Sequence, residues 1–379
     1  PESAGNEEQE SDESEAAPER SQEEQQDQSQ AQVTMEDSAD MEQGDEAELP
    51  EGEAPLWRYW GPRLNPQAAA PHGLRESRPL PSFMLDFDQP LTLAPSFGVG
   101  WFGQSALLAH RGGQAFAQAF NQCEVHSDGL PHDPQKVRVV LTDTVAQIEL
   151  TVHLHLDADS DVLVMRSNLR NLADTVLDVQ WLAAGTLLLP GKAVSVRSYA
   201  GQHNHEFLQQ TDPLSRSLWR RESRRGRTSH DCFPGAVVAT AGTTDDAGLV
   251  YGAHLAWSGN HQQTIEWLHD AQYQWQMGEW LAPGEGILEA GGTWQSPTLL
   301  ASCSALGCNG LATNFHSQLR SQLPWFKGQM KPRPVHLNTW EGFYFDVYPE
   351  PVKELATAEQ YEIKATEIVP FFIEKFSSK

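Results

Sequence analysis

Residues 145–156 read VAQIELTVHLHL, a run along which apolar and polar side chains alternate. A period of two is typical of a β-strand that buries one face and exposes the other. The polar cluster at residues 157–161 (DADSD) ends the run, as a turn should, and alternation resumes at residues 162–169 (VLVMRSNL). The sequence therefore predicts two successive β-strands here.

The same signal extends along most of the chain, from about Leu56 to Leu300. Short apolar or alternating segments recur at a spacing of about ten residues, with turn-forming residues between them. They include residues 137–141, 175–182, 193–196, 235–240, 248–257, 263–268 and 273–278. Because no strand–helix–strand rhythm and no internal repeat interrupts them, they predict a mainly β fold of the sandwich type.

The pattern changes near the C-terminus. Residues 311–323 place apolar side chains four positions apart, which predicts a helix that Pro324 ends. Residues 334–338 (PVHLN) predict a short buried strand, and residues 352–366 predict a second helix.

The formal net charge of −26 is concentrated at the N-terminus. Residues 1–54 hold about 20 Asp and Glu against one basic residue, Arg20, and almost no large apolar residues. Such a segment cannot bury enough surface to offset the entropy lost on ordering, so we expect it to be disordered. A solvating tail is favoured over an acidic interaction arm.

Several classes of protein are not expected from the composition. No apolar run approaches the ~18 residues of a membrane span, and no signal peptide is visible. Basic residues form only one short run, within residues 220–227, which argues against a nucleic-acid partner. The four cysteines are widely spaced, which favours free core thiols over a disulfide or a zinc site. These features together indicate the cytoplasm.

Two loops are candidate sites. Residues 97–104 (FGVGWFGQ) contain three glycines, which permit a tight exposed loop with Trp101 and Phe102 at its tip. A structural turn with buried aromatic rings is the alternative. Residues 201–206 (GQHNHE) could place His203 and its neighbours around a metal ion, although a hydrogen-bonding loop is favoured.

Two further segments combine polar groups that could act chemically. Residues 222–231 (ESRRGRTSHD) hold Ser, His and Asp, but residues so close in sequence rarely form a catalytic triad. A polar network that braces a loop is the better interpretation. Residues 333–346 (RPVHLNTWEGFYFD) open from an apolar strand into Asn, Trp and Glu, which suits either the end of a barrel strand or an ordinary core strand followed by a turn.

Taken together, these segments resemble glycoside hydrolase family 36, the α-galactosidase type. The family pattern consists of a Phe-Gly-x-Gly loop and four further motifs in order. They correspond here to residues 97–100, 161–169, 223–230, 257–260 and 333–346. The resemblance covers about residues 56–346.

The resemblance implies a large antiparallel β-sandwich (a supersandwich) over residues 55–305, after a disordered acidic tail at residues 1–54. It implies a linker helix within residues 306–332 and, within residues 333–379, the first strand of an incomplete (β/α)8 barrel with a divergent end. The implied activity is retaining hydrolysis of terminal α-galactosides such as melibiose or raffinose. It further implies galactoside oligosaccharides as partners, no metal or other cofactor, no membrane, and a homo-oligomer in the full-length family.

The resemblance also implies where substrate binds. It places Trp340 at the galactose pocket, Trp101 where many members carry Asp, and His203 where many carry Trp, so these three are the predicted substrate contacts. The Asp-Asp-Gly-Trp motif that follows the first barrel strand in the family is not found after Asp346. We therefore expect no catalytic carboxylate pair in this chain and no activity of the chain alone. A non-catalytic carbohydrate-binding or interaction module is the alternative.

Overall fold

The computed structural model describes residues 31–36, 54–62, 91–130, 133–226, 228, 231–268, 272–323 and 340–352. The chain divides into two compact units, residues 1–321 and 322–379, which are described separately below.

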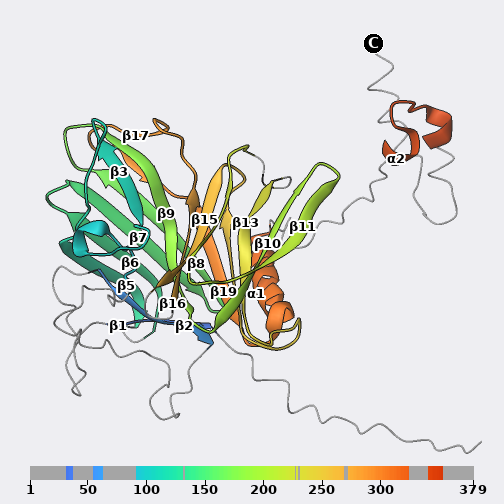
Figure 1. Cartoon of the computed structure of the whole chain (residues 1–379), viewed down its shortest axis with the longest axis horizontal. Coiled ribbons are helices and arrows are strands. Elements are labelled where there is room, and N and C mark those ends of the chain that lie inside the picture. The colour runs from blue at the N-terminus through green and yellow to red at the C-terminus, as the bar shows by residue number, and fades with distance from the viewer. Residues whose placement is uncertain are drawn as a thin grey trace, which may run out of the picture. The chain divides into compact units, whose positions relative to one another are not determined.

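The first unit is built from two large sheets whose strands pair antiparallel (Figure 1). The ten-stranded sheet runs β11 (His205–Pro213), β10 (Ala193–Gln202), β13 (Cys232–Thr240), β14 (Val250–Ala256), β19 (Thr298–Ser304), β8 (Val162–Asn171), β7 (Ile148–Asp157), β6 (Asp133–Asp143) and β5 (Gln122–Leu130), with β18 (Thr293–Gln295) on β8. The seven-stranded sheet runs β12 (Leu218–Ser223), β15 (His261–Leu268), β16 (Gln272–Glu279), β9 (Leu177–Pro190), β3 (Leu107–Arg111) and β4 (Gln114–Ala115), with β17 (Gly286–Leu288) on β9. The predicted mainly β sandwich is confirmed.

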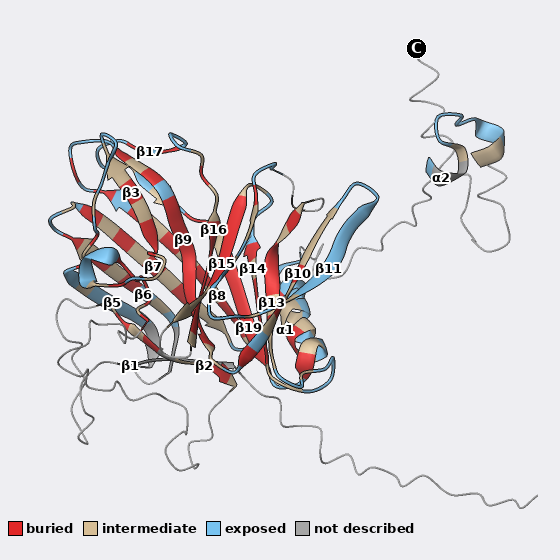
Figure 2. Ribbon diagram, viewed as in Figure 1, coloured by how far each residue is buried: buried red, intermediate tan, exposed pale blue. Residues whose placement is uncertain are grey.

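Strands β5 to β8 form a meander whose alternation places one row of side chains in the core and the next outside. Along β7, residues at every second position from Ile148 to Leu154 are buried, and those between them are partly exposed. Figure 2 shows this as alternating bands of red and tan. The predicted strand at 145–156 begins three residues late, because residues 144–147 form the turn that joins β6 to β7. Val145 is 89% exposed there, and the main chain at Gln147 has a φ of 52°.

The core lies between the two sheets. Trp275 and Leu187 of one sheet and Met165 and Leu299 of the other are fully buried. A Cβ atom at Gly185 would lie 2.9 Å from Met165 and 2.9 Å from Leu299, so the sheets approach closely at this point. Each fully buried Leu or Met side chain contributes roughly 1.5–3 kcal/mol to the free energy of unfolding.

A two-stranded sheet joins the N-terminal segment to the sandwich. Ala31–Glu36 forms β1, which pairs antiparallel with β2 (Leu56–Pro62). Trp60 of β2 packs edge-on against Tyr251 of β14, with ring centroids 5.1 Å apart. The prediction that the whole of residues 1–54 is disordered is therefore wrong for β1, whose AQVTME sequence is the one stretch of the segment with alternating apolar residues. Residues 1–30 and 37–53 lie outside the described residues.

Helix α1 (Gly307–Gln322) follows β19 and packs on the outer face of β14. It begins four residues before the predicted start, because Gly307 takes a left-handed φ of 65° and the Ser304 hydroxyl accepts a hydrogen bond from the Leu306 amide (3.0 Å). A Cβ atom at Gly252 of β14 would lie 2.7 Å from Cδ2 of Leu311, so glycine lets the helix approach the strand closely. Arg320 in the last turn has the sign that favours the helix dipole.

The second unit is described only over residues 340–352, where Trp340–Phe343 forms the short helix α2. The predicted strand at 334–338 lies outside the described residues, as does all but the first residue of the helix predicted at 352–366. Among the helices of the described ranges, none is long and apolar enough to span a bilayer.

Candidate functional site

The glycine-rich loop at residues 97–104 forms the best-built candidate site. It opens with a single 3-10 turn (η1, Phe97–Val99), and Gly100 ends the turn with a left-handed φ of 84°. The Gly98 amide donates a hydrogen bond to the carbonyl of Gln118 (2.7 Å), and a Cβ atom at position 98 would lie 2.3 Å from that oxygen. Glycine is therefore required for the close approach of the two backbones.

The two aromatic residues of this loop have separate positions. Trp101 is buried, with 8% of its surface exposed, whereas Phe102 is 68% exposed. The interpretation as a structural turn with buried rings is thus right for Trp101, and the interpretation as an exposed loop tip is right for Phe102. Sequence alone could not decide this, because adjacent residues in a loop have no fixed alternation.

The polar face of β15 and β16 lies directly beneath the loop. The Gln104 amide donates to Glu266 (2.7 Å to Oε2), and the Gln104 carbonyl accepts from Nε2 of Gln274 (2.7 Å) and of Gln276 (3.3 Å). Glu266 and Gln274 are cross-strand partners, while the adjacent pair, Ile265 and Trp275, faces the core. Three hydrogen bonds at one residue therefore fix the loop to the outer face of the seven-stranded sheet.

Glu266 is the carboxylate of this site. Burial raises its pKa, and the hydrogen bond from the Gln104 amide opposes part of that rise. A Cβ atom at Gly103 would lie 2.8 Å from the indole nitrogen of Trp101 and 3.1 Å from Oε2 of Glu266, so glycine lets the loop pass between them. The buried Trp101 N–H has no hydrogen-bond partner among the described residues. The arrangement offers an exposed ring and a partly exposed carboxyl group, which suits a polyhydroxylated ligand.

The arginine-rich segment at the end of β12 and just after it forms a bracing polar network, as predicted. Arg225 pairs with Asp231 (3.1 Å), Arg221 pairs with Asp212 (2.8 Å), and Glu222 pairs with two arginines. The guanidinium of Arg224 lies 4.6 Å from the ring centroid of Trp280. Ser229 and His230 lie outside the described residues, so the rejected triad has no structural test.

The other two predicted contacts lie on other elements. His203 is exposed in the turn between β10 and β11, where its ring lies 4.0 Å from Glu206. Glu206 accepts a hydrogen bond from the Asn204 amide (3.0 Å), so the segment is a hydrogen-bonded turn. Within the described ranges no group of three His, Cys, Asp or Glu side chains could hold a metal ion.

Trp340 belongs to the second unit. It is half-exposed in α2, and its ring packs edge-on against Tyr344 (5.6 Å between centroids) and Phe345 (5.0 Å). Trp101, His203 and Trp340 are thus placed on a loop, a hairpin turn and a separate unit.

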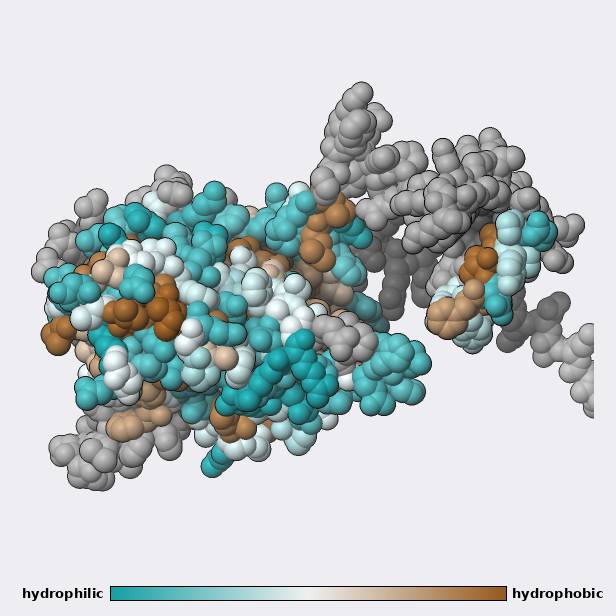
Figure 3. Space-filling model, turned by 90° about the horizontal axis from the view of Figure 1, so that it is seen from above, coloured by the Kyte–Doolittle hydropathy of each residue, from teal (hydrophilic) through white to brown (hydrophobic). Residues whose placement is uncertain are grey.

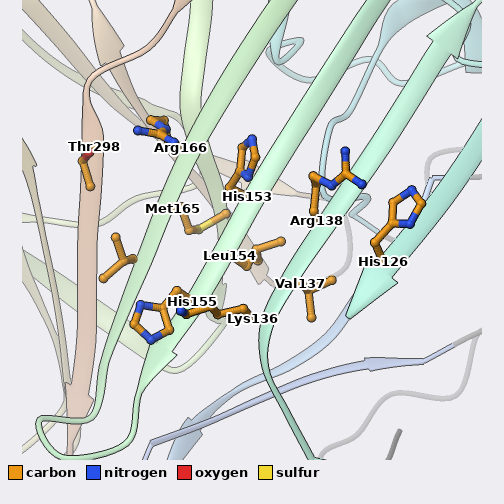
Figure 4. A pocket seen from close by; sticks show the side chains of 11 residues that line it. His126, Lys136, Val137, Arg138, His153, Leu154, His155, Met165, Arg166 and Thr298 are labelled. Atoms are coloured by element: carbon orange, nitrogen blue, oxygen red, sulfur yellow. The ribbon is translucent and has the colours of Figure 1, made fainter. Parts of the chain in front are cut away.

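One feature was missed by sequence analysis. A hollow of about 440 Å³, which we call the cationic groove, lies on the outer face of β5 to β8 and is lined by Arg, Lys and His side chains (Figure 4). The signal was the outward positions of consecutive strands, Lys136 and Arg138 on one and His153 and His155 on the next. Recognising it required the register between strands, which the sequence does not give.

Comparison with known proteins gives consistent results. The family model for the glycosyl hydrolase family 36 N-terminal domain matches residues 53–289, and the melibiase model matches residues 293–367. The alpha-galactosidase of Escherichia coli is 35% identical over 279 residues, which cover 74% of this chain and 38% of that enzyme.

Solved structures share the fold. The galactosidase domain of the alpha-galactosidase–sucrose kinase AgaSK matches 80% of this chain and 45% of its own, with a TM-score of 0.66 at 25% identity. The family 36 alpha-galactosidase AgaA of Geobacillus stearothermophilus, in complex with stachyose, matches 87% of this chain and 47% of its own, with a TM-score of 0.70 at 20% identity. The chain thus spans less than half the length of these relatives.

Proposed function

Because this chain belongs to glycosyl hydrolase family 36, we propose that it supplies the N-terminal part of an α-galactosidase that acts on oligosaccharides such as melibiose or raffinose. The observation that carries the proposal is the succession of two family models, N-terminal domain and then melibiase, along one chain. A stand-alone module would account for the first match and not for the second.

We propose that the loop at residues 97–104 contributes to galactoside binding. The exposed Phe102 ring offers an apolar face for the C–H face of a sugar, and the partly exposed Glu266 offers hydrogen bonds to hydroxyl groups. Trp101 acts from below by holding the loop in place. Trp340 and His203 remain proposed contacts, since both are exposed.

We propose that the 379-residue chain alone does not turn over substrate. Retaining hydrolysis needs two carboxyl groups about 5–5.5 Å apart. Among the described carboxylates near the proposed contacts, Glu266 lies on β15, Glu206 lies on β11, and Asp346 belongs to the second unit. Binding without chemistry is therefore the expected behaviour of this chain.

We also propose a cytoplasmic homo-oligomer. The low cysteine content supports the location. The edge strand β11 supports self-association: it is exposed along its length, as its pale blue colour in Figure 2 shows, and carries the exposed Phe207 and Leu208. An exposed apolar edge favours pairing with another strand.

The test combines hydrolysis and binding. The purified chain should release no chromophore from a chromogenic α-galactoside above the buffer rate, yet should bind raffinose in saturation-transfer NMR and should not bind the β-galactoside lactose. Phe102→Ala should weaken raffinose binding about tenfold, the loss expected when one aromatic contact of about 1.4 kcal/mol is removed. Val145→Ala, which removes an 89% exposed apolar side chain in the turn between β6 and β7, is the matched control. Hydrolysis that disappears in Glu341→Gln would contradict the proposal.

A chimera separates the enzyme domain from a binding module. Replacing the matching part of the Escherichia coli alpha-galactosidase with residues 53–289 should give an enzyme that still hydrolyses α-galactosides. A folded chimera without activity would favour the non-catalytic module instead.

A further inference from the structure

Four positively charged or titratable side chains form a line across the outer face of the ten-stranded sheet. His126 of β5 is the cross-strand partner of Arg138 of β6, which pairs with His153 of β7, which pairs with Arg166 of β8. We call these four residues the cationic row, and Figure 4 shows them side by side across the strands. Lys136 and His155, themselves cross-strand partners, add a second pair beside the row.

The row has little negative charge to balance it. No Asp or Glu is among the described residues that line the groove. Glu124 pairs with His126 at one end (3.3 Å), but no ion pair joins Arg138 or Arg166 to a described carboxylate. Nε of Arg166 is buried without a hydrogen-bond partner in the described structure. Two guanidinium groups on either side of His153, neither paired with a described carboxylate, favour an anionic occupant.

The shape of the site favours an extended occupant over a compact one. Neighbouring strands lie about 4.8 Å apart, so the row extends over roughly 14 Å. The groove is open along this line and has a volume of about 440 Å³. Several anionic groups arranged along a chain can reach the row together, whereas a single small anion contacts only part of it.

The chain itself carries such a series of anions. Residues 1–30 contain 11 Asp and Glu and a single basic residue, Arg20. This segment leads directly into β1, which pairs with β2 of the sandwich unit. Thirty residues can extend to about 100 Å, so reach is not limiting. A tethered ligand acts at an effective concentration of the order of millimolar, which favours it over free anions.

We propose that the cationic groove binds the carboxylates of residues 1–30 of the same chain. The segment then neutralises the row and covers the open part of the sheet. The proposal does not depend on the galactosidase assignment, because it rests on the register of β5 to β8 and on the charge of the segment. A free multivalent anion binds this groove only by displacing the segment.

The pKa of His153, in the middle of the row, should depend on whether carboxylates occupy the groove. Burial lowers the pKa of His153, and the nearby Arg166 and Arg138 lower it further. Its Nε2 lies 3.1 Å from the amide nitrogen of Asn168. Carboxylates in the groove would offset the effect of the two arginines, so removing them should lower the pKa of His153 again.

The test neutralises the segment without shortening the chain. Variant one carries six changes to Gln or Asn at Glu7, Glu8, Glu10, Asp12, Glu13 and Glu15. Variant two, the matched control, carries six such changes at Asp37, Asp40, Glu42, Asp45, Glu46 and Glu48. Titration with inorganic pyrophosphate, followed by the histidine side-chain NMR signals, should show about tenfold tighter binding in variant one than in the unaltered chain, because the tethered competitor is removed. Variant two should bind pyrophosphate like the unaltered chain.

A second change locates the site. Adding Arg138→Gln and Arg166→Gln to variant one should abolish pyrophosphate binding while the circular dichroism spectrum stays unchanged. Equal pyrophosphate affinity in variant one and the unaltered chain would overturn the proposed occupant. Binding that persists after loss of both arginines would overturn the proposed site.

Discussion

The outer face of the ten-stranded sheet has two halves that differ in what lies on them. On β14 and β19 the face is covered by α1, where Phe315 packs against His254 (5.4 Å between ring centroids) and Asn314 donates a hydrogen bond to Ser302 (3.0 Å). On β5 to β8 the same face carries the cationic row and is open. Outward positions with small or apolar side chains are covered by the protein's own helix, and outward positions with charged side chains are left available to a ligand.

Two histidines, His254 in the covered half and His153 in the open half, show how the two halves differ. The pKa of His254 is lowered by burial under α1, and a hydrogen bond with the backbone of Leu255 opposes this. The pKa of His153 is lowered by burial and also by two neighbouring arginines. The first histidine is neutral because water is excluded, and the second is held neutral in part by charges that an anion can offset.

The largest expected effect lies on the covered half. Leu311 of α1 packs against β14 and is 3% exposed, and Leu311→Ala should lower the free energy of unfolding by about 3 kcal/mol, since it removes buried methyl groups and leaves a cavity. Val164→Ala, on the same face in the open half, should cost about 1 kcal/mol or less, because its side chain is only partly buried. Urea unfolding measures both. Equal losses would show that the two halves are covered alike.

A smaller effect should appear as the pH is lowered. His254 has a lower pKa in the folded chain than the ordinary value of 6.5, so the unfolded chain binds a proton first. Its contribution to stability is present above pH 6.5 and is lost as the pH falls through the lowered pKa. Glu266 and Glu279 have raised pKa values in the folded chain, so their pH dependence has the opposite sign. Their contribution to stability is present below pH 4.5 and is lost as the pH rises through the raised pKa values.

Thermal melts between pH 7.5 and 5.5 provide the measurement. His254→Gln should make the melting temperature less dependent on pH, while His203→Gln, at an exposed turn, should leave the dependence unchanged. If both variants kept the original slope, burial under α1 would not be the source of the effect.

The smallest effect is expected at the cationic row. Arg138→Gln should change the free energy of unfolding by less than about 0.5 kcal/mol, as surface substitutions usually do. It should raise the pKa of His153 without restoring the ordinary value, because burial is the larger cause of the shift. NMR titration of His153 measures this change. A His153 pKa that does not respond would mean that Arg138 is too far away to act on it.

The sequence predicted the strands well where alternation was long. Residues 148–156 alternate strictly and form β7, and residues 162–169 form most of β8. The prediction was wrong at Val145, because the apolar pair before Gln147 imitates a strand while the backbone has already turned. A segment's pattern reports which side chains can be buried, and it does not report where the chain reverses.

The site was harder to predict for a different reason. The view that basic residues gather only at residues 220–227 was wrong, because the cationic row collects residues that are 12 to 15 positions apart in sequence and adjacent in register. Elsewhere the surface of the sandwich unit is mostly polar, with separate apolar patches (Figure 3). Trp101 and Phe102, adjacent in sequence, could not be assigned to core and surface without the contacts of Gln104.

The meander that carries the cationic row has a consequence for how the chain folds. Strands β5 to β8 follow one another within residues 122–171 and pair with one another through hairpins, so the contacts among these four strands are local in sequence. By contrast, β9 pairs with β16, and the loop that must close between them spans about 80 residues. Local contacts form faster than distant ones, and chains fold from the N-terminus as they are synthesised. The groove is thus expected to be assembled early, while the nascent acidic segment is already present beside it and the second sheet is still being made.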